Sequence, residues 1–220
     1  MTIALKKLSF ALILITAILV VILIGQINDA RIISTKVQQI PLISPVSVNI
    51  PITGDDFILG NPGAPLTVVA FLNFADRQSL RDYRTISALV NKNPKKMRLL
   101  VKHYPSRAFF SNPLLVHQAA LCAGKQGRYW TFLNDVAESK HTLRQTQLTD
   151  LAENNQLSMT AWTACLSDEA TNAAIQKDLQ IVNELILPAA PVIFINNKLL
   201  NPEEAVDLTQ LLTTFITTDL

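Results

Sequence analysis

The stretch LTVVAFLNFADRQSL, residues 66–80, contains two hydrophobic patterns that meet near its middle. Residues 66–74 are nearly all apolar, as in a strand that is buried on both faces of a sheet. After Asp76 the apolar residues take a helical spacing, which continues over residues 78–90. The stretch therefore predicts a strand that turns directly into a helix, a corner at which α/β proteins often place functional groups.

The same patterns predict the elements that follow this corner. Further strands are expected at residues 97–103 and 191–196, with 198–200 as a hairpin partner after Asn196-Asn197 and a closing helix at 202–216. Helices are expected at residues 113–123, 128–139, 147–154, 158–166 and 169–185. The order β-α-β, helical block, β-β-α predicts a three-layer α/β fold with a helical insertion at residues 106–186.

The N-terminal part differs from the rest of the chain. Residues 8–24 carry no charge and follow Lys6 and Lys7, so they predict a signal anchor, a single transmembrane helix with its N-terminus in the cytoplasm. A cleaved signal peptide is the alternative. We expect an anchor at residues 1–25, an extended linker at 26–54 and an extracytoplasmic domain, periplasmic or extracellular, at 55–220.

Composition excludes several function classes. The net charge of +2 and the 16% of charged residues give no basic surface of the kind that binds nucleic acid. The three histidines, His103, His117 and His141, are scattered without the spacing of metal ligands. We expect no metal and no cofactor.

Four segments of the chain resemble a known family in their order and spacing. They are residues 59–69 (LGNPGAPLTVV), 102–105 (KHYP), 118–130 (QAALCAGKQGRYW) and 190–198 (APVIFINNK). Together they are similar to the DsbA-like thiol–disulfide oxidoreductases of the thioredoxin superfamily. The resemblance covers residues 55–217 and implies a thioredoxin-like fold with a helical insertion.

The resemblance fails at the residues that carry the family's activity. That activity needs a Cys-x-x-Cys motif at a helix start, where free N–H groups and the helix dipole stabilise a thiolate. Here Asp76 and Ser79 take the two cysteine positions, with Arg77 and Gln78 between them. We predict that Asp76 is a helix N-cap at a former redox site. A nucleophilic Ser79, similar to the serine of kappa-class glutathione transferases, is the alternative.

Two further features follow from the resemblance. It implies a cis-proline at Pro191, so Ala190, Pro191 and Val192 are candidate peptide-binding residues, unless the fold alone needs that turn. Relatives often carry cysteines at the positions of Cys122 and Cys165, and an extracytoplasmic location favours a disulfide between them. Two separate buried thiols are the alternative.

The sequence thus leads to one main functional hypothesis and two alternatives. The main hypothesis is a membrane-anchored domain that has lost its redox motif and binds an extended peptide or an envelope protein near Pro191. The first alternative is an atypical oxidoreductase that works through Cys122 and Cys165. The second is a purely structural subunit of an envelope complex.

Overall fold

The structure is a computed structural model that describes residues 16, 18–21, 23, 43–105, 113–139, 143–201 and 207–218. Contacts divide the chain into two units, Met1–Pro41 and Leu42–Leu220. The predicted membrane anchor at residues 8–24 lies largely outside the described residues, and those of its residues that are described are helical. Within the described residues, no helix reaches the length and apolarity needed to cross a bilayer.

The second unit contains the predicted order of elements, with two short strands in front of it. Its described strands are β1 (Ile43–Ser47), β2 (Ile58–Gly60), β3 (Leu66–Leu72), β4 (Met97–His103), β5 (Val192–Ile195) and β6 (Lys198–Leu200). Its described helices are α2 (Arg77–Lys92), α3 (Pro113–Gly124), α4 (Tyr129–Glu138), α5 (Gln145–Asn154), α6 (Met159–Leu166), α7 (Glu169–Glu184) and α8 (Leu208–Thr217). The strand-to-helix corner, the helical block and the closing hairpin form where the sequence predicts them.

The described strands form one sheet in the order β1-β6-β5-β3-β4-β2. β3 and β4 are parallel and joined by the crossover helix α2, whereas the other neighbouring pairs are antiparallel. β3 is hydrogen-bonded to a strand on each side. This central position explains why the strand that begins the opening stretch is apolar on both faces.

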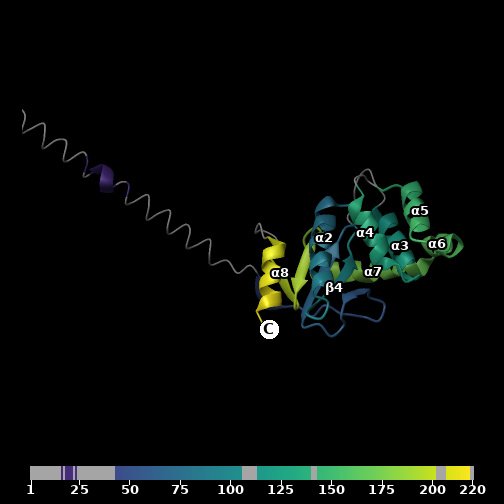
Figure 1. Cartoon of the computed structure of the whole chain (residues 1–220), viewed down its shortest axis with the longest axis horizontal. Coiled ribbons are helices and arrows are strands. Elements are labelled where there is room, and N and C mark those ends of the chain that lie inside the picture. Colours follow the sequence, from purple (N-terminus) through teal and green to yellow (C-terminus); the bar gives the residue numbers. More distant parts are fainter. Residues whose placement is uncertain are drawn as a thin grey trace, which may run out of the picture. The chain divides into compact units, whose positions relative to one another are not determined.

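Helices cover both faces of the sheet. Alternate residues of a strand point to opposite faces. Val68 and Ala70 join a large cluster with α2, α3, α4 and α8, whereas Val69 and Phe71 join a smaller one with α7. In Figure 1, α8 lies beside α2 at one end of the folded unit, and α5 and α6 lie at the other end. The predicted three-layer arrangement is confirmed.

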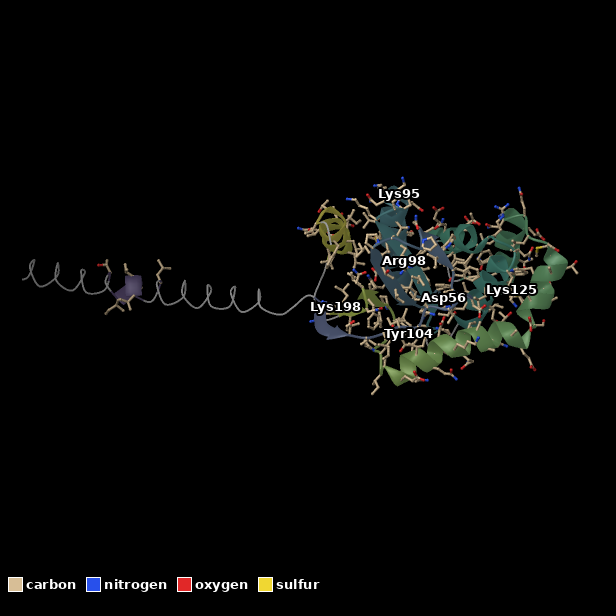
Figure 2. The ribbon with its side chains drawn as sticks, turned by 90° about the horizontal axis from the view of Figure 1, so that it is seen from below. Asp56, Lys95, Arg98, Tyr104, Lys125 and Lys198 are labelled. Carbon is tan, nitrogen blue, oxygen red and sulfur yellow. A yellow bond between two sulfur atoms is a disulfide. The ribbon has the colours of Figure 1, made fainter. Side chains whose placement is uncertain are left out.

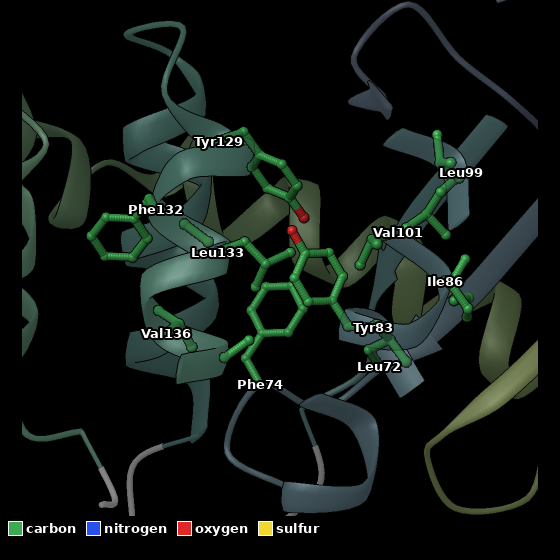
Figure 3. Packing of buried hydrophobic residues seen from close by; sticks show 14 of the residues in the cluster. Leu72, Phe74, Tyr83, Ile86, Leu99, Val101, Tyr129, Phe132, Leu133 and Val136 are labelled. Carbon is green, nitrogen blue, oxygen red and sulfur yellow. The ribbon is translucent and has the colours of Figure 1, made fainter. Parts of the chain in front are cut away.

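The larger cluster joins the helical insertion to the sheet. Phe132, Leu133 and Val136 of α4 pack in the same cluster as Phe74 and Tyr83, as Figure 3 shows. Each of these side chains is at most 2% exposed, and burying a side chain of this size contributes about 1.5–3 kcal/mol. The insertion and the sheet therefore share one hydrophobic core.

The predicted linker ends earlier than the sequence suggested. Its residues 43–54 belong to the folded unit, because β1 pairs antiparallel with β6, placing Ile43 opposite Leu200. Ile50 is 2% exposed and packs in the smaller cluster. Pro45 fits an edge strand, because a proline has no backbone N–H to donate to a further strand. The recurring prolines indicated an extended backbone, which residues 43–47 have, but they could not reveal its pairing partner. Residues 26–42 of the predicted linker lie outside the described residues.

The closing hairpin also follows the prediction. β5 and β6 are joined by Asn196 and Asn197, whose φ angles are 47° and 66°. Two consecutive residues with positive φ are typical of the tight turn that matches the twist of paired strands, and asparagine tolerates that conformation better than most residues.

Candidate functional site at the strand-to-helix corner

The corner between β3 and α2 contains the first of the predicted site residues. Asp76 has extended backbone angles (φ −104°, ψ 132°), and its Oδ2 accepts the N–H of Ser79 at 2.7 Å. The carboxylate satisfies one of the N–H groups that a helix start leaves without a partner, and its charge lies at the favourable end of the helix dipole. The prediction that Asp76 is an N-cap is confirmed.

Ser79 connects β3 to α2 on the buried side of the corner. Its side chain is completely buried, and its Oγ accepts the N–H of Asn73 at 3.2 Å. The hydroxyl therefore holds the end of β3 against the first turn of α2. A buried hydroxyl offers no access to a substrate in solution, so this geometry argues against Ser79 as a nucleophile.

The two residues between Asp76 and Ser79 lie on the surface. Arg77 and Gln78 are both exposed. Gln78 donates through Nε2 to Asp82 at 2.7 Å and accepts from Arg81 at 2.5 Å, so a short chain of polar contacts follows the outer face of α2. The exposed residues of the corner are thus Ala75, Arg77 and Gln78, whereas Asp76 is half-buried and Ser79 is buried.

The second predicted element lies beside this corner. The peptide bond between Ala190 and Pro191 is cis, as predicted. β5 begins at the next residue and pairs with β3, with Val192 opposite Phe71. This register brings the Ala190–Pro191 loop next to the end of β3. Ala190 and Pro191 are half-buried, whereas the Val192 side chain is 2% exposed and belongs to the core.

Two histidines are in contact on the core side of the corner. The sequence did not predict this contact. His103 ends β4 and His117 lies in α3, and their Nδ1 atoms are 2.9 Å apart. His117 Nε2 accepts the N–H of Phe74 at 3.1 Å, and its ring stacks on the Phe74 ring with 4.2 Å between centroids. Phe74 lies two residues before Asp76. The histidine pair therefore supports the backbone of the corner from within the core.

The hydrogen bonds assign the protons of this pair. Because His117 Nε2 accepts a backbone N–H, neutral His117 carries its proton on Nδ1 and donates it to Nδ1 of His103. Burial lowers the pKa of His103 to about 3, and the charge of Lys102 adds to this effect. Burial likewise lowers the pKa of His117 well below its usual value. Both rings are neutral near pH 7. The pair is therefore a fixed structural contact that does not exchange a proton with a substrate.

A buried ion-pair triad lies next to His103 in sequence, on the opposite face of β4. Lys102 Nζ is 2.6 Å from Asp56 Oδ1 and 3.4 Å from Asp178 Oδ1, and all three side chains are at most 10% exposed. Asp178 Oδ2 also accepts the N–H of His103 at 2.7 Å. Two carboxylates share one ammonium group, and desolvation raises the pKa of Asp178 to about 6 despite the lowering effect of Lys102.

The segment before β2 is anchored so that Asp56 reaches this triad. The Phe57 ring stacks on Tyr129 with 4.1 Å between centroids. It also packs against Gly124 of α3, where the Cβ of any other residue would collide with the ring. Asp56 Oδ2 accepts the N–H of Thr53 at 2.7 Å. These contacts place a cavity of about 250 Å³ between this segment, β4 and α7.

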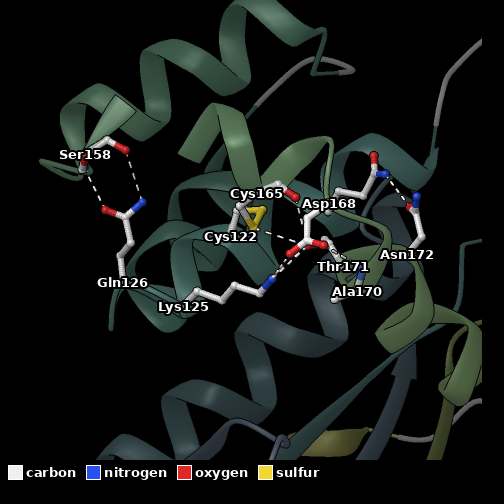
Figure 4. Close-up of a disulfide and its surroundings, with 10 residues drawn as sticks. Cys122, Lys125, Gln126, Ser158, Cys165, Asp168, Ala170, Thr171 and Asn172 are labelled. Carbon is white, nitrogen blue, oxygen red and sulfur yellow. Dashed lines mark hydrogen bonds and ion pairs between the residues drawn. A yellow bond between two sulfur atoms is a disulfide. The ribbon is translucent and has the colours of Figure 1, made fainter. Parts of the chain in front are cut away.

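The two cysteines lie in the helical insertion and form a disulfide. Cys122 of α3 and Cys165 of α6 are bonded, with their Cα atoms 5.7 Å apart (Figure 4). Beside the bond, Lys125 donates to Asp168 at 3.2 Å and to Thr171 at 3.1 Å. The predicted pairing is confirmed, and the alternative of two separate thiols is wrong. Because the chain has two cysteines, none remains for thiol chemistry at the corner.

Known proteins share this architecture. The sequence matches the Thioredoxin_4 family, described as thioredoxin, over residues 53–214. The chain belongs to this family. No curated protein matches its sequence.

Solved structures with a similar fold come from several bacteria. A thioredoxin-like oxidoreductase from Silicibacter pomeroyi DSS-3 is 20% identical with a TM-score of 0.65, covering 74% of this chain and 91% of that one. BdbD from Bacillus subtilis, in its oxidised form, is 19% identical with a TM-score of 0.63, covering 77% and 95%. The thiol-disulfide exchange protein alpha-DsbA2 from Wolbachia pipientis is 18% identical with a TM-score of 0.62, covering 72% and 84%. At these identities the likeness shows the fold, a thioredoxin-like α/β domain with a helical insertion.

Proposed function

We propose that this Thioredoxin_4 domain binds an extended peptide or protein segment at the corner and does not exchange disulfides there. One observation carries the proposal: both cysteines are bonded to each other in the insertion, while Asp76 and Ser79 occupy the corner. A mixed disulfide requires a thiolate, and neither a carboxylate nor a hydroxyl can form one. The capping bond of Asp76 and the burial of Ser79 give both residues structural roles instead.

The accessible groups around the corner support a binding role. Arg77 and Gln78 are exposed at the start of α2, and the half-buried Ala190 and Pro191 lie next to the end of β3. Extended peptides bind folded domains by pairing with accessible backbone, while alternate side chains enter neighbouring hollows. An extended segment laid beside Ala190 would therefore run past the first turn of α2.

The proposed location is outside the cytoplasm, with the domain held at the cell membrane by residues 8–24. The Cys122–Cys165 disulfide supports this location, because disulfides persist in oxidising compartments and are rare in the cytosol. The partner would then be an envelope protein or a peptide in transit through the envelope.

We expect the wild-type protein to reduce insulin no faster than the background reaction with dithiothreitol. The double variant Asp76→Cys/Ser79→Cys should give a clear rate above background, because the helix start that Asp76 now caps also stabilises a thiolate. Insulin precipitation, followed by turbidity, measures both on the same scaffold. Wild-type activity that disappears in Cys122→Ser would overturn the proposal in favour of the oxidoreductase alternative.

We expect Ala190→Arg to weaken the binding of an unfolded, carboxymethylated polypeptide by about tenfold, a loss of about 1.4 kcal/mol. The bulky side chain would block the half-buried loop next to the corner. Fluorescence anisotropy of the labelled polypeptide measures the affinity. Ala164→Arg, at an exposed position of α6, is the matched control and should bind like the wild type. Equal affinities for both variants would show that the loop is not part of the binding site. A wild-type protein that binds no polypeptide would favour the alternative of a structural subunit.

A further inference from the structure

The buried triad joins three segments that are far apart in the sequence. Asp56 precedes β2, Lys102 lies in β4 and Asp178 lies in α7. Lys102 contacts both carboxylates, at 2.6 Å and 3.4 Å, so a single ammonium group holds the segment before β2 and α7 against the sheet. In Figure 2, α7 runs along the bottom of the folded unit and Asp56 is labelled above it.

The same end of β4 also holds the loop that follows α7. Tyr104, two residues after Lys102, donates its hydroxyl to the carbonyl of Leu187 at 3.4 Å, and its own N–H bonds to Leu72 at 2.9 Å. Leu187 lies between the end of α7 and Pro191. The triad and Tyr104 therefore fasten α7 and the loop before Pro191 to one short stretch of strand, which also contacts the end of β3.

The charged side chains around the triad include more carboxylates than ammonium groups. Asp178 and Asp56 share Lys102, whereas at the mouth of the adjoining cavity Lys177 is 3.8 Å from Asp55. The charged or titratable groups that line the cavity are Asp55 and Asp56 from the segment before β2, Lys102 and His103 from β4, and Lys177, Asp178 and Glu184 from α7. Tyr129 of α4 interacts electrostatically with Asp178, and burial raises the pKa of its phenol well above the usual value. Because His103 is neutral, the triad keeps one surplus negative charge when both carboxylates are ionised.

We propose that the Asp56–Lys102–Asp178 triad is a proton-operated latch that holds α7, and with it the loop before Pro191, against the end of β4. At neutral pH the contact is weakened chiefly because the ionised carboxylate of Asp178 is desolvated by burial, and to a smaller extent because Asp56 repels it across the shared lysine. A proton taken from solvent onto Oδ1 of Asp178 removes both of these costs. Asp178 gives up its attraction to Lys102, which is a smaller effect than the desolvation, and Lys102 stays paired with Asp56. Oδ2 of Asp178 still accepts the N–H of His103, so the helix stays in place while its hold becomes tighter.

Amide hydrogen exchange of the wild-type protein at pH 7.5 and pH 5 tests the latch. After correction for intrinsic exchange rates, protection of the amides in residues 178–184 should rise about tenfold at the lower pH. Amides of α5, which has no residue in the triad, should change much less. An equal rise in α5 would show that proton uptake stabilises the whole domain and would overturn the local latch.

Two variants make the test specific. Asp178→Asn keeps an oxygen that can accept the His103 N–H but cannot take up a proton, so α7 should lose its pH dependence. Glu184→Gln removes an acid that lines the same cavity on the same helix, and should keep the wild-type response. A carboxyl ¹³C titration of Asp178 should give a midpoint near pH 6. A midpoint at or below the ordinary value, or pH dependence that survives in Asp178→Asn, would overturn the proposal.

The consequence for ligand binding rests on the proposed function. If the loop before Pro191 forms one wall of a peptide site, the affinity for the carboxymethylated polypeptide should rise at pH 5 in the wild type and stay constant in Asp178→Asn. Hydrogen exchange needs no ligand, so failure of the peptide site leaves that measurement able to support or overturn the latch alone. A latch that operates without any change in affinity would refute only its coupling to the corner.

Discussion

Lys102→Met is expected to lower the free energy of unfolding by about 3–5 kcal/mol at neutral pH, because it leaves two buried carboxylates without their cation. Asp56 and Asp178 are each 10% exposed, so water cannot replace the lost ammonium group. Methionine keeps most of the length and apolar surface of the lysine side chain. The expected loss therefore reports the charge and not a packing defect. Urea unfolding followed by circular dichroism measures it.

The pH dependence of this loss has a definite sign. Burial raises the pKa of Asp178 from 3.8 to about 6 in the folded protein, so the folded state binds this proton more tightly than the unfolded state does. The stability that this proton gives to the folded state is fully present below about pH 4 and is lost as the pH rises through 6. Without Lys102 the pKa of Asp178 should rise further, because the lysine is the main influence that lowers it. The deficit of Lys102→Met should therefore be smaller at pH 5 than at pH 7.5.

Lys177→Met is the matched control for this prediction. Lys177 also pairs with an aspartate, but its side chain is 70% exposed and the contact with Asp55 is 3.8 Å long. Exposed ion pairs of this kind contribute little, so the variant should change the free energy of unfolding by about 0.5 kcal/mol or less. Equal effects of the two substitutions, at either pH, would contradict the buried triad.

The corner itself could be predicted from the sequence because its signals are local. The apolar strand, the aspartate before a helical pattern and the Asn196-Asn197 turn each depend on residues that are close together in the chain. The resemblance to a family placed Pro191 and the two cysteines, which no local pattern could do. Asp76 was identified as a cap because an N-cap needs only its own carboxylate and the N–H groups that follow it.

The groups behind the corner were missed because their contacts are not local. His103 and His117 are 14 positions apart, and Lys102 is 46 positions from Asp56. One signal could have indicated the triad. Alternate residues of a strand share a face, so Lys102 follows Leu100 on a face that should be buried. A lysine at such a position requires a buried acid, although the sequence does not identify which of the aspartates supplies it.

Ser79 shows a different limit of sequence analysis. The helical stripe that includes Tyr83 and Val90 also brings Ser79 close to the buried side of α2, but a polar residue in a first turn is usually solvated. Its burial depends on the N–H of Asn73, which the strand presents only when the corner is folded. The contact therefore arises from tertiary structure, and no residue pattern near Ser79 predicts it.

Reduction of the Cys122–Cys165 disulfide is expected to lower the free energy of unfolding by about 2–5 kcal/mol. The bond joins residues 43 positions apart, and closing a loop of this length restricts the unfolded chain by about 4 kcal/mol in the chain-entropy description. Urea unfolding with and without dithiothreitol measures the difference. The variant Cys122→Ala/Cys165→Ala is the control, since its stability should be low from the outset and should not respond to the reductant.

The region that loses protection from hydrogen exchange on reduction distinguishes a structural disulfide from a catalytic one. Cys122 is completely buried in α3 and lies nine residues after the helix begins at Pro113, so it lacks the free N–H groups that activate a thiolate. Reduction should therefore increase hydrogen exchange in α6, which the bond fastens to α3, while β3 and the first turn of α2 keep their protection. If reduction instead exposed the corner residues and left α6 unchanged, the bond would be coupled to the corner and the proposed binding-only function would be wrong.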